Sequence, residues 1–498
     1  MRLQVLLEHI GAAGHSDIGP IRVSGDQEVE VTSVAHDSRR VRPGALFACI
    51  RGSHFDGHEH AAEAVEGGAV ALLVERELAI PVSQVVVPSV RAAIGPAAAA
   101  AAGWPSREIT CMGITGTNGK TTTTYLLESI GEAAGRTVGV IGTTGARIDG
   151  TPVALAHTTP EAPELQELLA RMRDEAVGMV AMEVSSHALA QHRVDGTRFA
   201  VVVFTNLSHD HLDFHGSIED YYEAKARLFA PEFAPAAVIG IDDERGPDLV
   251  TRAERNGLHV LTYALDRDAD VHASGLRPTE VGMEFVLTDT RSDESVAVTI
   301  SLIGRVNVLN ALAAATTAIL TGVDLPTIAD GLRTASAVPG RLERIDAGQP
   351  FTVVVDYAHT PDALEHALAA ARAHAGEHQV IAVVGCGGDR DRAKRPKMGG
   401  LVATRADAAI ITSDNPRSES AAAIADEMLT GVPARATWVR VELDRRRAIR
   451  DAIDLAEPGD VVLVAGKGHE SGQTADGVTV PFDDRAVARE ALEVMSWS

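Results

Sequence analysis

Short apolar runs alternate with longer amphipathic stretches through the middle of the chain, from Ile109 to about residue 335. A short apolar run is typical of a buried strand, and a longer stretch with apolar positions three and four residues apart is typical of a helix. Their alternation predicts a mostly parallel, doubly wound sheet with helices on both faces. After the first apolar run, we expect strands at 137–141, 177–183, 199–206, 236–241 and 258–263.

The stretch from 271 to 303 follows a different pattern. Its short runs alternate between apolar and polar residues, as in Met283–Leu287 and Val296–Leu302. Such alternation predicts strands with one buried face, and we expect them as antiparallel additions to the same sheet. An alanine-rich helix should follow at Asn307–Leu320.

The first 105 residues predict a smaller α/β domain. We expect a turn and strand at 41–50, a helix at 60–66, strands at 69–74 and 85–87, and an alanine-rich helix at 91–103. Trp104-Pro-Ser-Arg107 then marks a boundary, because proline and polar residues interrupt both periodic patterns.

Strand and helix patterns restart after a second boundary at Val338-Pro-Gly340. The expected strands are 351–355, 380–384, 408–412 and 461–464. Their alternation with helical stretches predicts a third, Rossmann-like α/β domain. We therefore expect an α/β protein with domains at 1–106, 107–337 and 338–498.

Composition limits the possible functions. A length of 498 residues, with 45% apolar residues, is typical of about three domains with large cores. The net charge of −24 argues against a nucleic-acid partner. We find no membrane-length apolar run and no signal-peptide pattern. Three cysteines cannot form a disulfide framework, which favours a reducing compartment. We therefore expect a cytoplasmic protein, and the lack of a membrane-length apolar run predicts no membrane span.

The clearest chemical motif is Gly116-Thr-Asn-Gly-Lys-Thr-Thr, between an apolar run and an amphipathic stretch. This order predicts a strand, a glycine turn and a helix whose N-terminus favours anions. Lys120 adds a full positive charge, and Thr121 a hydroxyl suited to phosphate-bound Mg²⁺. The strict P-loop pattern requires glycine where Ile114 stands, so a glycine turn with a solvent-facing lysine is the alternative. We interpret the motif as a triphosphate cradle.

A dense titratable cluster, Ser208-His-Asp-His-Leu-Asp-Phe-His215, follows the expected strand at 199–206. Glu183 ends another expected strand and adds a carboxylate. Beside a triphosphate cradle, these groups favour a Mg²⁺ site. A zinc site and a metal-free, hydrogen-bonded loop are the alternatives.

Several other polar turns have two interpretations. Asp37-Ser38-Arg39 could be a cap and turn or have a functional role. His157-Thr-Thr-Pro160 and Ser185-Ser-His187 could hold a phosphate or carboxylate, or could be caps. By its pattern alone, Lys225 is a surface lysine of an amphipathic helix.

Polar clusters follow each expected strand of the third domain. They are Asp356–His359, Gly385–Arg390, Asp414–Arg417 and Gly466–Glu470. In open α/β sheets, ligands bind at the carboxyl ends of the strands, so we expect these loops to share one site.

Together these motifs resemble those of the Mur ligases, ATP-dependent amide ligases that build the peptide stem of the cell wall. The resemblance runs in order through all three domains and rests on Gly116–Thr122, Glu183-Val-Ser-Ser-His, Thr205–His215, Glu223-Ala-Lys-Ala-Arg, Pro339-Gly-Arg341 and Asp356-Tyr-Ala-His-Thr-Pro. Asp37-Ser-Arg39, Asp414-Asn-Pro-Arg417 and Gly466–Glu470 narrow it to the branch that adds the third stem residue. The resemblance implies an N-terminal UDP-sugar-binding domain, a central P-loop ATPase-type domain and a C-terminal amino-acid-binding domain.

The resemblance also implies residue roles. ATP would be bound by Gly116, Thr117, Asn118, Gly119, Lys120, Thr121, Thr122, Asn307, Arg341 and Asp356. Mg²⁺ would be held by Thr121, Glu183, His211 and a CO₂-derived carbamate on Lys225; Lys120, Lys225 and His211 would be catalytic. UDP-N-acetylmuramoyl-L-alanyl-D-glutamate would contact Ser38, Thr158, Thr159, Ser185, Gln191 and Arg193. The incoming amino acid would contact Arg390, Asp414, Asn415, Pro416, Arg417, Gly466 and Glu470.

We expect that amino acid to be meso-diaminopimelate, because the arginines can bind a second carboxylate and the acidic groups an ammonium. L-Lysine or a shorter diamino acid is the alternative. Folylpolyglutamate synthetase and cyanophycin synthetase resemble the same central domain, but the Asp37-Ser-Arg39 and Asp-Asn-Pro-Arg motifs argue against both. A P-loop switch or motor and an inactive scaffold are further alternatives. We expect a monomer.

Overall fold

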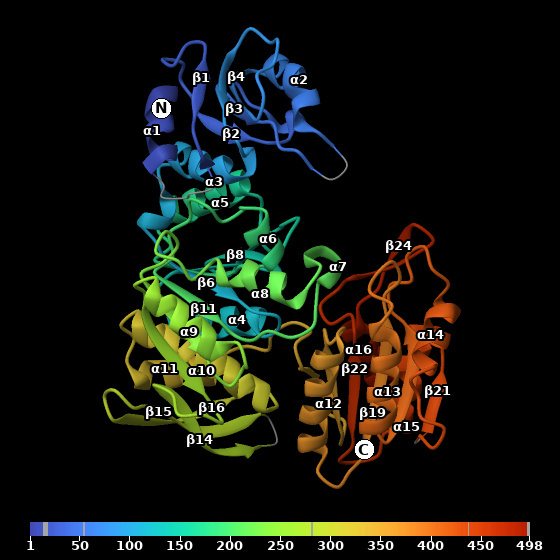
Figure 1. Cartoon of the computed structure of the whole chain (residues 1–498). Helices are drawn as coiled ribbons and strands as arrows, with labels where there is room; N and C mark the ends of the chain where they lie inside the picture. The colour runs from blue at the N-terminus through green and yellow to red at the C-terminus, as the bar shows by residue number, and fades with distance from the viewer. Residues whose placement is uncertain (13–17, 53–54, 280–281, 437, 496–498) are drawn as a thin grey trace.

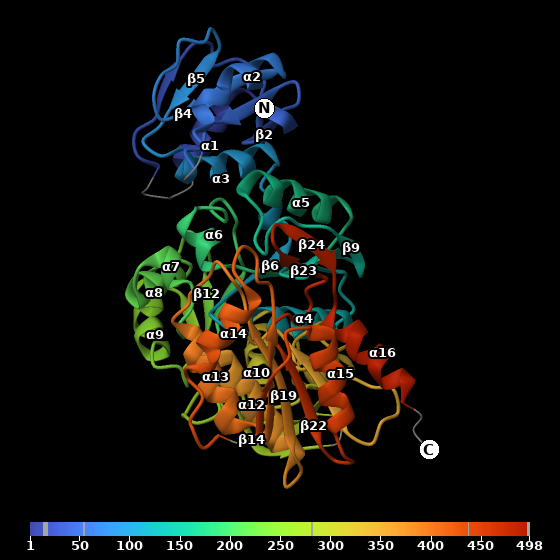
Figure 2. The ribbon, with the colours of Figure 1, turned by 90° about the vertical axis from the view of Figure 1, so that its right-hand side faces the viewer.

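The computed structural model describes residues 1–12, 18–52, 55–279, 282–436 and 438–495. Three α/β units follow one another along the chain, each built on its own sheet (Figure 1). The N-terminal unit lies at one end of the central unit, and the C-terminal unit lies against its side, as the view in Figure 2 also shows. The predicted fold class is therefore confirmed, while the domain boundaries after residues 106 and 337 stay predictions.

The N-terminal sheet has the strand order β1-β5-β4-β3-β2. β1 pairs antiparallel with β5, and the other pairs are parallel. Its strands are β1 (Arg22–Ser24), β2 (Ser33–Ala35), β3 (Ala45–Ala48), β4 (Ala69–Val74) and β5 (Ser83–Val86). Its helices are α1 (Leu3–Ala12), α2 (Ala61–Glu66) and α3 (Val90–Ala101), with short 3₁₀ turns η2 (Ser38–Arg40), η3 (Gly57–His60) and η4 (Pro105–Arg107).

The central sheet has the order β16-β15-β14-β13-β12-β11-β6-β10-β7-β8-β9, parallel from β14 to β7 and antiparallel at both ends. Its parallel strands are β6 (Thr110–Thr115), β7 (Val138–Gly142), β10 (Met179–Glu183), β11 (Val201–Phe204), β12 (Ala236–Gly240), β13 (His259–Ala264) and β14 (Val271–Pro278). The additions are β8 (Gly145–Ile148), β9 (Thr151–Val153), β15 (Met283–Asp289) and β16 (Glu294–Ile300). The expected antiparallel additions are confirmed for β15 and β16, whereas β14, at the start of this stretch, pairs in parallel with β13.

Side chains along these strands point alternately to the two faces of the sheet, and each face has its own hydrophobic core. Met112, Ile114 and Val203 belong to one core, while Cys111 and Val202 belong to the other. Because successive strand residues point to opposite faces, each face needs its own layer of helices. One layer is α4 (Lys120–Ala133), α10 (Arg305–Leu320) and α11 (Leu325–Thr334). The other is α5 (Ala162–Asp174), α6 (Ser186–Ala190), α8 (Ile218–Ala226) and α9 (Gly246–Arg255).

The C-terminal sheet has the order β17-β18-β22-β19-β20-β21, with β17 antiparallel. Its strands are β17 (Glu343–Ile345), β18 (Thr352–Asp356), β19 (Val380–Cys386), β20 (Ala408–Ser413), β21 (Trp438–Val441) and β22 (Val461–Ala465). Helices α12 (Pro361–Ala375), α13 (Lys394–Arg405) and α14 (Ala421–Leu429) cover one face, and α15 (Arg445–Leu455) and α16 (Asp484–Val494) the other. A separate hairpin is formed by β23 (Gly472–Ala475) and β24 (Val478–Pro481).

In the described part of the chain, we find no helix with the length and hydropathy needed to cross a bilayer. The three cysteines are buried and carry free thiols.

The N-terminal and central units touch through backbone atoms. Gly95 lies in the middle of α3, and a Cβ atom there would be 2.1 Å from the carbonyl oxygen of Asp195. Gly196 has a φ of +83°, and its Cβ would lie 2.8 Å from the carbonyl oxygen of Gly95. The contact therefore needs glycine on both sides, because side chains would force the backbones apart.

We predict that Gly95→Ala destabilises the protein by about 1–3 kcal/mol, the usual range for overpacking. Differential scanning calorimetry should show a lower melting temperature. Gly11→Ala is the control, because a Cβ at this exposed position in α1 has no neighbour within 4 Å and alanine favours the helix. Equal melting temperatures for the two variants would contradict the prediction.

Candidate active site

The Gly116–Gly119 loop joins β6 to the N-terminus of α4, so the predicted strand, turn and helix are confirmed. Gly116 has a φ of +148° and Gly119 one of +89°. Cβ atoms at these positions would lie 1.9 Å from the Thr205 Oγ1 and 2.4 Å from the Asn310 Oδ1. Both positions therefore require glycine, and the loop wraps tightly at the start of the helix.

Lys120 folds back over this loop. Its Nζ donates to the carbonyl oxygens of Gly116 at 2.9 Å and Thr117 at 2.8 Å. Burial lowers the pKa of Lys120, and the Glu183 carboxylate opposes that shift. The amine therefore lies where a phosphate bound by the loop would meet it.

Glu183 is a buried carboxylate, 1% exposed, at the end of β10. Its Oε1 accepts hydrogen bonds from the Thr121 Oγ1 at 2.9 Å and the Thr143 backbone N–H at 2.8 Å. The Thr143 hydroxyl donates to Oε2 at 3.0 Å. One carboxylate and a hydroxyl beside a phosphate loop are the hard oxygen donors that suit Mg²⁺.

His211 stands before α7 (Leu212–His215), with a φ of +54°. Its Nε2 lies 3.3 Å from the Asp210 Oδ2, and its ring packs edge-on against His187 at 4.7 Å between centroids. Burial lowers the pKa of His211, which favours the neutral imidazole, the form that can bind a metal ion. Among the described residues, no three His, Cys, Asp or Glu side chains gather as they do in a zinc site. The residues present fit Mg²⁺, which takes its other ligands from phosphate and water.

For Lys225, helical periodicity alone predicts an environment that differs from the one in the structure. It is 1% exposed, so the surface position predicted from the pattern is wrong. α8 turns Tyr221, Tyr222 and Lys225 inward, because the buried face of this short helix includes long side chains with polar ends. The Lys225 Nζ donates to the Gly116 carbonyl oxygen at 2.7 Å and lies 4.3 Å from the Tyr221 ring centroid. Burial, reinforced by the charge of Lys120, holds the pKa of Lys225 well below its usual value.

The residues expected to bind ATP come from two units and line one cavity of about 260 Å³. Asn307 comes from α10, and Arg341 and Asp356 come from the C-terminal unit. Arg341 donates to the Thr121 Oγ1 at 3.4 Å, and Asn118 donates across the same junction to Asp362 at 2.9 Å. Burial raises the pKa of Asp356 to about 6, with Arg341 opposing the shift. Of the loop residues, Gly116 alone is absent from the lining, since it lies beneath Lys120.

The residues expected to hold the dipeptide also cluster, with one exception. Thr159 donates to the Glu183 backbone oxygen at 2.9 Å, and Arg193 donates to the Thr159 carbonyl at 3.1 Å. Thr158, Ser185 and Gln191 contact this group through Thr143, Thr159 and Arg193 respectively. Ser38 lies apart in the N-terminal unit, where it donates to Glu63 at 2.8 Å. The structure therefore brings five of these six residues together.

The loops after β18, β19, β20 and β22 surround a second cavity of about 510 Å³, so they lie together as expected, and their role as one ligand site stays a prediction. Its lining includes Arg390, Asp414, Asn415, Arg417, Gly466 and Glu470. Pro416 lies behind it and packs against Gly388. The two cavities have Asp210, His211, Tyr357 and His359 in common, and therefore adjoin.

Matches to three family models cover most of the chain. They are the Mur ligase family catalytic domain at residues 30–105, the Mur ligase middle domain at 114–318 and the Mur ligase glutamate ligase domain at 340–468. The chain belongs to the Mur ligase family. Mur ligases are ATP-dependent enzymes that form amide bonds.

Individual Mur ligases match over almost the whole chain. A protein of Geobacillus thermodenitrificans is 44% identical, with 99% of each chain covered, and one of Streptomyces coelicolor is 46% identical, with 94% of each covered. Both are named UDP-N-acetylmuramoyl-L-alanyl-D-glutamate–2,6-diaminopimelate ligase, or MurE. A solved structure of the same name has 33% identity, a TM-score of 0.72 and 99% coverage of both chains.

Sequence reasoning gave no role to Lys467, although it lies inside the quoted Gly466–Glu470 motif. This completely buried lysine donates to the Asn415 Oδ1 at 3.0 Å and the Glu470 Oε2 at 2.9 Å. The Asn415 Nδ2 also donates to Glu470, at 2.7 Å. The Asn415 amide is therefore held inside the protein, with one N–H left for a ligand. His359, at the junction of the cavities, was also given no individual role.

We predict that Lys120→Ala lowers ATP-dependent phosphate release by this Mur ligase by at least about 100-fold, because the variant loses the charge opposite the transferring phosphoryl group. Phosphate release measured with all substrates, and circular dichroism for the fold, test this expectation. Lys397→Ala, at an exposed position of α13, is the matched control. Near-normal turnover of Lys120→Ala would exclude Lys120 from the phosphate site.

Proposed function

We propose that the protein uses ATP to join meso-diaminopimelate to UDP-N-acetylmuramoyl-L-alanyl-D-glutamate, the reaction named for its relatives. The observation that carries this proposal is the junction of the two cavities. One is built on a phosphate loop, and the other has arginines and carboxylates on its wall. A reaction that first phosphorylates a carboxylate and then couples it to a diamino acid needs a phosphate-binding cavity directly beside an amino-acid-binding cavity.

The first step activates the acceptor carboxylate of the dipeptide. A carboxylate oxygen attacks the γ-phosphorus of ATP, the bond to ADP breaks, and an acyl phosphate forms. Lys120 and the N-terminus of α4 stabilise the negative charge of this transfer. Thr159 bonds to the Glu183 backbone and Arg193 bonds to Thr159, so both would hold the dipeptide toward the loop.

Thr121, Glu183 and His211 would hold Mg²⁺, which, when bound, neutralises charge on the phosphates. The low pKa of Lys225 favours its free amine, the form that reacts with CO₂. The amine nitrogen bonds to the carbon of CO₂ and releases one proton, which leaves a carbamate anion. Lys120 and Lys225 donate to the same carbonyl oxygen, so the carbamate would balance the charge of Lys120.

In the second step the amine nitrogen of the amino acid attacks the acyl carbon and loses a proton, and phosphate leaves. The residues common to both cavities lie where the amine and the acyl phosphate would meet. Most of the catalytic effect then comes from positioning, since the groups are supplied by different units of the chain.

For the amino acid itself, Arg390 and Arg417 would bind a carboxylate, while Asp414 and Glu470 would accept from an ammonium group. Lys467 already offsets part of the charge of Glu470, and the buried Arg445 interacts with the charge of Asp414. We place the reaction in the cytoplasm, where ATP and the nucleotide-linked dipeptide are available. A monomeric state remains a prediction.

We predict that Lys225→Ala loses most of its activity and regains part of it with small carboxylic acids in the buffer, because such acids replace the carbamate. Carbon-13 NMR with labelled bicarbonate supplies a second readout, a carbamate signal present in the wild type and absent in the variant. If the wild type gives no such signal and carboxylic acids do not restore activity, then Lys225 has a structural role.

We predict that meso-diaminopimelate is preferred over L-lysine by at least about 100-fold in kcat/KM, because lysine leaves buried polar groups unpaired. ADP release with each amino acid at several concentrations measures this ratio. Comparable values for lysine, or a preference for ornithine or diaminobutyrate, would contradict the specificity proposed here. ADP release with folate substrates instead of the dipeptide would favour the folylpolyglutamate synthetase alternative.

A further inference from the structure

The two arginines that face the amino-acid cavity stand on different loops. Arg390 follows β19 and Arg417 follows β20. Asp389 has a φ of +54° and Arg417 one of +55°, a backbone conformation that costs free energy for any residue except glycine. Surrounding contacts must therefore hold both loops in this shape.

Arg395, a completely buried residue of α13, binds both loops at once. Its two terminal nitrogens donate to the Glu419 carboxylate at 2.7 and 2.9 Å, and one of them donates to the Gly387 carbonyl at 3.2 Å. The Glu419 Oε1 also accepts the backbone N–H of Asp389 at 2.6 Å. The bond from Arg395 lowers the pKa of Glu419 to about 2, so this carboxylate keeps its charge. A single carboxylate thus joins the loop of Arg417 to the residue before Arg390.

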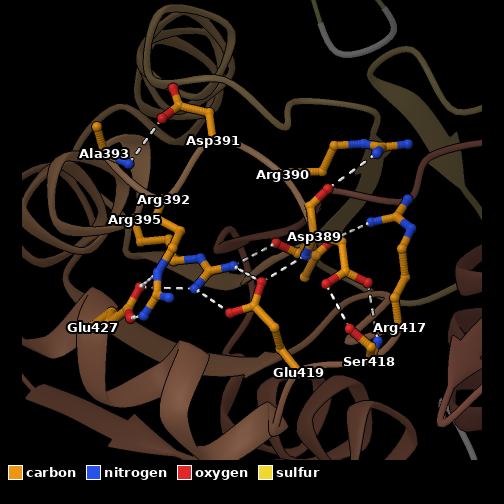
Figure 3. Close-up of polar contacts among 12 residues, drawn as sticks. Asp389, Arg390, Asp391, Arg392, Ala393, Arg395, Arg417, Ser418, Glu419 and Glu427 are labelled. Carbon is orange, nitrogen blue, oxygen red and sulfur yellow. Dashed lines mark hydrogen bonds and ion pairs between the residues drawn. The ribbon is translucent and has the colours of Figure 1, made fainter. Parts of the chain in front are cut away.

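Further hydrogen bonds join the same loops. Asp389 accepts from the Ser418 hydroxyl at 2.7 Å and from its backbone N–H at 3.1 Å. The Arg417 Nη1 donates to the Gly388 carbonyl at 2.7 Å, which fixes the direction of its guanidinium. A Cβ at Gly388 would lie 1.8 Å from the Pro416 carbonyl oxygen, so the loop backbones are in direct contact. Figure 3 shows Arg390 and Arg417 on one side of this network and Arg395 on the other.

We propose that Glu419 is a positioning residue for the amino-acid substrate, because it sets the separation of Arg390 and Arg417 through its bonds to Arg395 and Asp389. This inference rests on the proposed function of the cavity. Two guanidinium groups at a fixed separation recognise a carboxylate with less loss of conformational freedom than two independent loops. Glu419 itself is absent from the cavity lining, so it acts through the arginines.

Glu427 offers an internal comparison. It lies on α14 and accepts from the same Arg395 at 2.7 Å, and it also pairs with Arg392. The bonds of Glu427 connect α14 to α13 and to the turn before α13. The bonds of Glu419 instead connect the loop after β20 to the loop after β19 and to Arg395. Both carboxylates are partly buried, with exposed fractions of 22% for Glu419 and 28% for Glu427. Removing either charge weakens the binding of Arg395, but only Glu419 also accepts the backbone N–H of Asp389 and so acts on the loop of Arg390.

The test compares Glu419→Gln with Glu427→Gln in the full-length enzyme. Glu419→Gln should raise the KM for meso-diaminopimelate by about 10-fold or more, with kcat and the KM values for ATP and the dipeptide changed by less than about 3-fold. Glu427→Gln should leave all KM values within about 3-fold, although both variants melt at lower temperature. An equal rise in KM for both variants, or no rise for Glu419→Gln, overturns the inference.

Ser418→Ala provides a second route if Glu419→Gln fails to fold. Ser418 is exposed, and its loss removes one bond to Asp389, so we expect a smaller rise in the same KM and no change in melting temperature. Ser420→Ala is its control, because this neighbouring exposed serine makes no side-chain cap bond to α14. Equal KM values for these two variants also overturn the inference. Wild-type protein that turned over no diamino acid would overturn the proposed function, and this inference with it.

Discussion

Two lysine side chains meet at one backbone oxygen. Lys120 and Lys225 both donate to the carbonyl of Gly116, at 2.9 and 2.7 Å. Two ammonium groups in this buried, low-dielectric environment would repel each other strongly, so the site favours a neutral Lys225 or an added anion. The phosphate loop, the buried face of α8 and the glycine at position 116 all contribute to this arrangement. Its charge balance is the constraint on which the rest of the ligase site depends.

Much of the architecture could be predicted because apolar periodicity reports burial directly. β19 and β22, for example, are continuous apolar runs, and the polar clusters that follow them mark the edge of the sheet at which the cavity lies. The hairpin β23–β24 escaped prediction for the opposite reason. β24 is fully exposed, and its partner β23 is held by a distant loop, because the Arg417 N–H donates to the Thr474 carbonyl oxygen.

The site was predictable in its residue types and less so in its contacts. The phosphate loop is local in sequence, so its strand, turn and helix could be read from one stretch. The burial of Lys225 and the Asn415–Lys467–Glu470 network could not, because they join residues about 50 to 110 positions apart. The family resemblance supplied the importance of Lys225, which helical periodicity alone had assigned to the surface. Local pattern therefore identifies chemical groups, while tertiary packing decides their charge and orientation.

The wall common to the two cavities has a consequence for inhibition. Asp210, His211, Tyr357 and His359 line both the cavity of the phosphate loop, where we propose that ATP binds, and the second cavity, where we propose that the amino acid binds. A compound that bridges this wall would compete with two substrates at the same time. A resistance mutation that reshapes one side would leave its contacts on the other, and a change in the wall itself would impair the enzyme. The junction is thus the place where a single compound would contact both cavities.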